Sequence, residues 1–135
     1  MQRPKGFTLV EAVVVIIILT IMAAIAYPRF IRTMEVTIGR EARVDLELIL
    51  AAEKIIELQS GAYLPCNPPN DCNVELNLDL RFNNWLYDVT VTAPPNPTFL
   101  ATATRTSGTN AGTEITITEN GPPLVGTWPF LNLIQ

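Results

Sequence analysis

One acidic side chain interrupts a long apolar run near the start of the chain, and it is the first residue there that could do chemistry. Glu11 follows the stretch Gly6-Phe7-Thr8-Leu9-Val10, and the only other polar side chains between positions 7 and 26 are two threonines. An ionised carboxylate in hydrocarbon costs a few kcal/mol unless a partner neutralises it. The sequence therefore predicts that Glu11 meets a cation.

The apolar run itself, residues 7–26, predicts a membrane-spanning helix. Twenty helical residues extend about 30 Å, which matches the hydrocarbon core of a bilayer. A secretory signal peptide carries its small cleavage-site residue after the apolar region, whereas Gly6 precedes it here. We therefore expect the apolar helix to be retained. Arg3 and Lys5 favour a cytoplasmic N-terminus, and a plain N-terminal membrane anchor is an open alternative.

Signals for catalysis and for cofactor binding are weak in the rest of the chain. There is no histidine, which removes the commonest general base and the commonest metal ligand. Neither a glycine-rich phosphate loop nor a nucleophile elbow occurs. Glu114 and Glu119 fall in an expected strand as solvent-facing spacers. We expect no enzymatic activity, no cofactor and no metal site.

The charge balance argues against a dedicated nucleic-acid binder. The net charge is −4, and loss of Arg3 and Lys5 would make it −6. A nucleic-acid-binding domain is expected to carry a basic patch. DNA contact through a few arginines stays open.

The N-terminal motif resembles a known family. Gly6-Phe7-Thr8-Leu9-Val10-Glu11, with the apolar run that ends at Tyr27-Pro28, is similar to the N-terminus of type IV pilins and pseudopilins. The match covers roughly the first 30 residues, where the glycine, the aromatic residue, the glutamate and the proline all have the family spacing.

This resemblance implies processing and assembly. A prepilin peptidase would cut between Gly6 and Phe7, and Phe7 would be N-methylated. Glu11 would then meet the new amino group on Phe7 of a neighbouring copy, and Pro28 would shape the helix for assembly. Removing one member of such a buried pair costs about 3–5 kcal/mol. Implied partners are further copies in a helical filament, the inner membrane before assembly, the peptidase and the pilus assembly machinery.

The function implied by the resemblance is that of a structural subunit. We expect it to polymerise into an extracellular type IV pilus that serves adhesion, motility or DNA uptake. A pseudopilin of a type II secretion system is the first alternative, although the scarcity of carboxylates after Glu119 weakens it, because major pseudopilins carry a calcium site in their C-terminal loops. A monomeric, membrane-anchored binding module is the second alternative.

Two cysteines enclose a short proline-rich stretch. Cys66 and Cys72 flank Asn67-Pro68-Pro69-Asn70-Asp71. In an exported protein such a pair predicts a disulfide that fixes one surface loop. A structural zinc site needs four ligands, and the chain offers no further cysteine and no histidine.

Helical periodicity continues beyond the apolar run. We expect one helix from Phe7 to about Gln59, bent or locally melted at Pro28, with Gly39 as a second soft point. Ser60-Gly61 provides its stop. An apolar stripe faces the head at 42, 46, 49, 52 and 56, and Leu48, Ile55 and Leu58 are expected to widen it. Arg40, Glu41, Arg43 and Glu47 are expected to form a solvated or subunit-facing surface.

The C-terminal half predicts a small antiparallel sheet. Alternating patterns mark strands at 85–92, 99–106 and 113–119, separated by turns rich in proline, glycine and asparagine. Asn120-Gly121-Pro122-Pro123 is expected to be the closing turn, and 74–80 a further short strand with Val74, Leu76, Leu78 and Leu80 inward. The apolar tail 124–135 either packs on the sheet edge or forms an exposed patch.

Together these elements predict an α+β fold in which a long helix, half of it transmembrane, packs on about three to four antiparallel strands. The expected division is a leader at 1–6, a membrane or filament-core helix at 7–28, an amphipathic continuation at 29–60 and a globular head at 61–135.

Overall fold

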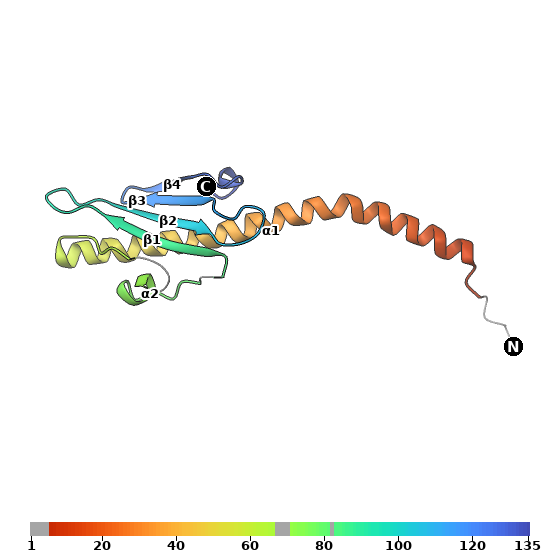
Figure 1. The fold of residues 1–135 in the computed structure, drawn as a ribbon, viewed down its shortest axis with the longest axis horizontal. Coiled ribbons are helices and arrows are strands. Elements are labelled where there is room, and N and C mark those ends of the chain that lie inside the picture. Colours follow the sequence, from red (N-terminus) through yellow and green to blue (C-terminus); the bar gives the residue numbers. More distant parts are fainter. Residues whose placement is uncertain (1–5, 67–70, 82) are drawn as a thin grey trace. The chain divides into compact units, whose positions relative to one another are not determined.

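The computed structural model describes residues 6–66, 71–81 and 83–135 (Figure 1). The chain forms two compact units, one that runs to Glu35 and one from Val36 to Gln135. The predicted leader, apart from Gly6, and the residues between the two cysteines, apart from the backbone of Asp71, lie outside the described residues.

Helix α1, Leu9–Ser60, accounts for the first half of the chain. It begins after Thr8, whose Oγ1 accepts a hydrogen bond from the Glu11 N–H at 3.2 Å, the usual arrangement of an N-cap. It ends at Gly61, which has a φ of 76° and donates its N–H to the Glu57 carbonyl. The helix contains Pro28 and continues past it. The predicted long helix is thus confirmed, with ends within two residues of those expected.

A four-stranded antiparallel sheet completes the head. Strands β1 (Trp85–Val91), β2 (Phe99–Arg105), β3 (Glu114–Thr118) and β4 (Gly121–Gly126) lie side by side in chain order. The sheet lies along the C-terminal part of α1 (Figure 1). The predicted α+β architecture is therefore confirmed.

The fourth strand begins where the sequence predicted a turn. Gly121 has a φ of 77° and pairs with Thr118, so the reversal is completed within Glu119 and Asn120, and the two prolines that follow belong to β4. Proline cannot donate to a sheet ladder, but it is tolerated on an edge strand, where one side of the backbone has no partner. The expected closing turn at 120–123 was therefore wrong in its extent.

The core lies between α1 and the inner face of the sheet. Ala42, Leu46 and Ile49 of α1 are fully buried. On the sheet, Ala101 and Ala103 of β2 are also fully buried, and bulkier buried residues flank them on both sides: Trp85, Tyr87, Val89, Ile115 and Ile117. Small side chains on an inner strand leave room for the helix, and the larger neighbours fill the volume around it.

Threonines dominate the opposite face of the sheet. The register aligns Asp88 with Thr102 and Thr102 with Thr116, all of which alternate with the buried positions. The alternation read from the sequence therefore assigned these strand faces correctly.

The apolar stripe of α1 was only partly assigned correctly. Positions 42, 46 and 49 are buried as predicted, but Leu48, Ile55 and Leu58 are 46%, 56% and 83% exposed. They lie on the side of the helix opposite the core, because residues spaced 3.6 to a turn place 48, 55 and 58 about half a turn from 46, 49 and 56. The core side instead carries Asp45 and Glu53.

The predicted strand at 74–80 was wrong. Helix α2, Asp71–Glu75, is followed by a turn in which Asn77 has a positive φ of 52° and the Leu78 N–H binds the Asn73 carbonyl. Asparagine, aspartate and glutamate are depleted in strands, and local hydrogen bonds satisfy the backbone here. Leu76 and Leu80 are buried as expected, whereas Val74 is 77% exposed.

The C-terminal tail packs back onto the head. Its last regular element is η1, Leu131–Leu133, and Trp128 and Ile134 on either side of it are each 2% exposed. Trp128 packs directly on Gly39 of α1, where any Cβ would collide with the indole ring. Gly39, expected as a second bend, is therefore a point of close approach between the helix and the tail.

Candidate functional site

The residues of the predicted processing site lie at the exposed start of the described chain. Gly6, Phe7 and Thr8 precede α1 and are exposed, and Phe7 exposes 69% of its surface. A Cβ built on Gly6 would have no atom within 4 Å, so packing among the described residues does not require glycine there.

Glu11 occupies the first turn of α1. Its backbone N–H is bound by the Thr8 hydroxyl, and the positive end of the helix dipole favours a negative charge at this position. The side chain is exposed, and within the described part of the chain it makes no hydrogen bond or ion pair. Its carboxylate is therefore held at the helix N-terminus and open to a partner from outside the chain.

The remainder of the N-terminal unit is an uncovered apolar helix. An 18-residue window of α1 near the N-terminus has a mean hydropathy of 2.9, and none of it is buried. Ile16, Leu19 and Met22 expose 63%, 60% and 63% of their surface. This is the one helix in the described residues that is long and apolar enough to cross a membrane.

A disulfide joins Cys66 to Cys72, as predicted, with their Cα atoms 4.9 Å apart. Both residues are 1% exposed, and Cys66 also exchanges two backbone hydrogen bonds with Val89 of β1. The link therefore attaches the start of α2 to the first strand of the sheet.

The head contains buried polar contacts that the sequence did not reveal. The Tyr87 hydroxyl donates to Asp45 Oδ2 at 2.6 Å, and the Trp85 indole N–H donates to the Ile38 carbonyl at 2.9 Å. Burial raises the pKa of Asp45, although the bond from Tyr87 acts in the opposite direction. Burial, followed by the bond to Asp45, raises the pKa of Tyr87. No periodic signal distinguishes such a carboxylate from the solvated ones on the same helix.

Glu53 is the second buried carboxylate. It is fully buried, its Oε2 accepts the Leu64 N–H at 2.9 Å, and its Oε1 has no partner in the described structure. Burial raises its pKa, and the single hydrogen bond offsets this only in part. The hydrogen bond from Leu64 to Glu53 therefore holds the loop that follows α1 against the helix.

The charged residues predicted to be a solvated surface are partly engaged with the head. The Arg43 guanidinium binds Glu47 at 2.8 Å, as the spacing predicted, and also donates to the Ile134 carbonyl. Glu41 accepts a hydrogen bond from the Asn84 side-chain amide at 3.0 Å. Glu41 and Arg43 therefore fix the helix to the sheet and the tail.

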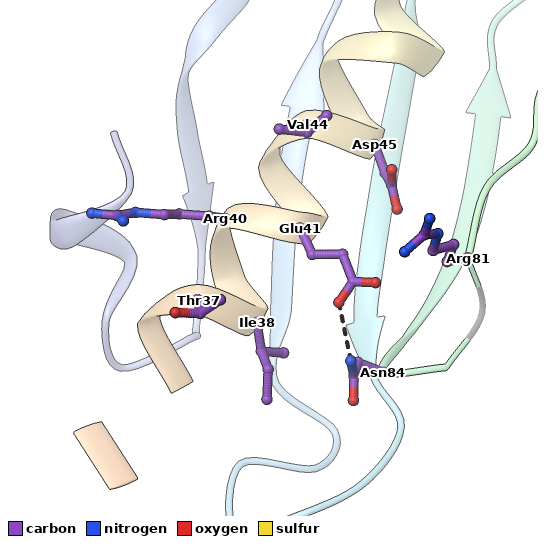
Figure 2. Close-up of a pocket in the computed structure, with 8 residues that line it drawn as sticks. All are labelled: Thr37, Ile38, Arg40, Glu41, Val44, Asp45, Arg81 and Asn84. Carbon is purple, nitrogen blue, oxygen red and sulfur yellow. Dashed lines mark hydrogen bonds between the residues drawn. The ribbon is translucent and has the colours of Figure 1, made fainter. Parts of the chain in front are cut away.

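A hollow of the head lies on this part of α1. It is a groove of about 630 Å³ lined by Thr37, Ile38, Arg40, Glu41, Val44, Asp45, Arg81 and Asn84. Figure 2 shows Arg81 directed toward the carboxylates of Glu41 and Asp45, and Arg40 directed away from them. Both carboxylates accept hydrogen bonds from side chains of the head, Glu41 from Asn84 and Asp45 from Tyr87.

Comparisons with known proteins agree with the N-terminal geometry. Residues 1–27 match the prokaryotic N-terminal methylation motif. The chain is also 40% identical over 61 residues to the type IV major pilin protein PilA of Myxococcus xanthus (strain DK1622). The N-terminal part of the chain is therefore similar to a type IV pilin. The matched segment covers 45% of the chain but only 28% of that relative, and no solved structure matches.

The matched motif lies over the uncovered apolar part of α1. The methylation motif includes Gly6, Phe7 and Glu11, and it ends one residue before Pro28.

Proposed function

We propose that the chain is a structural subunit that waits in the inner membrane and then polymerises through α1 into an extracellular type IV pilus. The observation that carries the proposal is the combination of the methylation motif with an 18-residue window of mean hydropathy 2.9 that has no cover within the described residues. Lipid can cover this surface before assembly, and the helices of other copies can cover it afterwards.

The energetics of such an exchange favour helix packing as the driving force. Lipid tails are as apolar as the helix, so transfer from lipid into a bundle brings little hydrophobic free energy. Close contacts between helices and hydrogen bonds between subunits must then supply the preference for the filament.

A second apolar surface on α1 supports assembly through helices. Val44, Leu48, Ala51, Ile55 and Leu58 are all exposed on the side of α1 away from the sheet, and they are spaced four, three, four and three residues apart. This is the spacing of a coiled-coil seam, which is suited to packing against another helix. The helix thus offers contacts in its head portion as well as in its apolar portion.

Glu11 is proposed to set the register between copies. Cleavage after Gly6 would place a cationic amino group on Phe7, four residues before Glu11 and exposed in the same way. The attraction between the two groups in a low dielectric is offset by the cost of desolvating them. The pair is therefore proposed to determine alignment more than overall stability.

Processing by a prepilin peptidase is proposed on the same residues. A glycine that the chain's own packing does not require, at the junction of a basic leader and an apolar helix, is suited to recognition by a protease. Methylation of Phe7, transfer to a pilus assembly machinery, and roles in adhesion, motility or DNA uptake belong to the proposal. No enzymatic activity is proposed.

Two measurements on exported material test this function. We expect negative-stain images of sheared surface material to show long fibres, and mass analysis of their subunit to give a methylated N-terminus at Phe7. Fibres absent from wild-type cells, with secretion lost on deletion, would favour a secretion pseudopilin. A monomer with Met1 intact would refute the proposal and favour a tethered binding module.

A further inference from the structure

The part of α1 that directly follows the apolar run has two different faces. Tyr27, Phe30, Ile31 and Met34 recur at helical spacing and expose 69%, 64%, 40% and 49% of their surface. Residues three, four and seven apart lie on one side of a helix. This side therefore presents an aromatic and aliphatic strip that the N-terminal unit itself leaves uncovered.

The other face of the same two turns carries two arginines. Arg29 and Arg32 are three residues apart, and both are exposed. The neighbouring Thr33 hydroxyl is already satisfied, because it donates to the Arg29 carbonyl at 3.0 Å. The groups on this face that can bind an anion are the guanidinium groups of Arg29 and Arg32.

The length of the preceding run places these residues at a defined depth. The helical part of the apolar run, residues 9–26, extends about 27 Å, so a bilayer that covers it ends near Tyr27. Aromatic side chains are enriched at the level of the lipid headgroups, where the ring is half immersed. Guanidinium groups bind phosphate through two parallel hydrogen bonds.

We propose that Arg29 and Arg32 bind the phosphate groups of membrane phospholipids, with Tyr27 and Phe30 immersed beside them, so that residues 27–32 form a lipid-headgroup site. The site holds the unassembled subunit at a fixed depth, and it must release its lipids when the subunit leaves for the filament. This inference rests on the membrane-resident stage of the proposed function. An anionic surface stabilises each nearby arginine by about 1 kcal/mol, equivalent to about fivefold in an equilibrium constant.

Solid-state NMR can measure the contact directly. The chain from Phe7 onward is labelled with ¹³C at the arginine guanidinium carbons, reconstituted in phosphate-free buffer into bilayers of phosphatidylglycerol and phosphatidylcholine, and probed by dephasing from lipid ³¹P. From Phe7 onward the chain contains six arginines, of which two are Arg29 and Arg32. About one third of the guanidinium signal is expected to dephase.

A pair of matched double variants assigns the signal. Arg29→Gln with Arg32→Gln is expected to abolish the dephasing. Arg40→Gln with Arg81→Gln removes two exposed arginines of the head and is expected to leave the dephased amplitude unchanged. Resistance to carbonate extraction is measured on every sample, so that insertion is known.

The outcomes are distinct. If the wild-type chain inserts but shows no dephasing, the lipid site is refuted, whereas residence in the membrane is not. The result would then point to an acidic protein partner for these arginines. Equal loss of dephasing in both double variants also overturns the site. A chain that never inserts overturns the site together with the proposed function.

Discussion

Gly39→Ala is expected to destabilise the head, although alanine is the better helix former. Replacing glycine by alanine within an exposed helix stabilises by about 1 kcal/mol. At this position the new Cβ would overlap three atoms of the Trp128 indole ring. Trp128 is 2% exposed, and its ring lies edge-on to Trp85 and Phe130 at centroid distances of 6.0 and 5.5 Å.

The change in unfolding free energy is the difference between the cost of the clash with Trp128 and the gain in helix propensity. The ring has no free direction in which to move, so overpacking should cost about 3 kcal/mol, at the upper end of the usual range. Subtraction of the helix-propensity gain leaves a net loss of about 2 kcal/mol. For a compact unit of this size, that loss lowers the melting temperature by roughly 8–16 °C.

A second background, which lacks the Trp128 ring, tests whether contact with that ring causes the destabilisation. A chain that starts at Arg29 keeps the whole compact unit from Val36 and omits the apolar run. Its urea unfolding is followed by far-UV circular dichroism, because tryptophan fluorescence would change with the variant itself. With Trp128→Leu, space opens above Gly39, and Gly39→Ala should then stabilise by up to about 1 kcal/mol.

The exposed Ala51 supplies the control. Ala51→Gly should destabilise by about 0.5–1 kcal/mol in either background, since only helix propensity changes there. If Gly39→Ala has the same effect in both backgrounds, or none in the wild type, the close-approach reasoning is refuted.

Three further predictions concern assembly, pH and the disulfide. Glu11→Ala should still insert and be cleaved but should form few fibres, because the Phe7 amino group would be buried unpaired at about 3–5 kcal/mol; abundant normal fibres in electron micrographs would count against the pairing. Glu53 has a raised pKa in the folded state, so it contributes stability fully below its unfolded pKa and loses that contribution as the pH rises through the folded value. Glu53→Gln should therefore flatten the fall in unfolding free energy from acidic to neutral pH, and an unchanged pH profile would contradict this. Reduction of the Cys66–Cys72 disulfide, which closes a short loop, should lower the unfolding free energy by about 2 kcal/mol in urea titrations; no difference between oxidised and reduced samples would show that the loop carries no such constraint.

Local patterns in the sequence determined most of the fold. The long helix followed from apolar and charged residues at helical spacing, and the three strands from strict alternation, because each such pattern fits one backbone period and one buried face. The N-terminal motif and the cysteine pair could also be recognised from the sequence, because both depend on short spacings along the chain.

Errors arose where a local pattern admitted two structures. Residues 74–80 alternate like a strand, yet the turn at Asn77 and the hydrogen bonds of Asn73 satisfy their backbone locally. Gly121-Pro122-Pro123 has the composition of a turn, but an edge strand needs fewer backbone donors than an inner one.

The sequence by itself determined that the chain has one long apolar helix, an N-terminal methylation motif and a set of alternating strands. Only the tertiary structure decided that Gly39 lies under Trp128 and that Asp45 and Glu53 are buried, whereas Leu48, Ile55 and Leu58 face outward. These features depend on contacts between segments up to about ninety residues apart, such as that of Arg43 with Ile134, and neither period nor propensity encodes which distant segments meet.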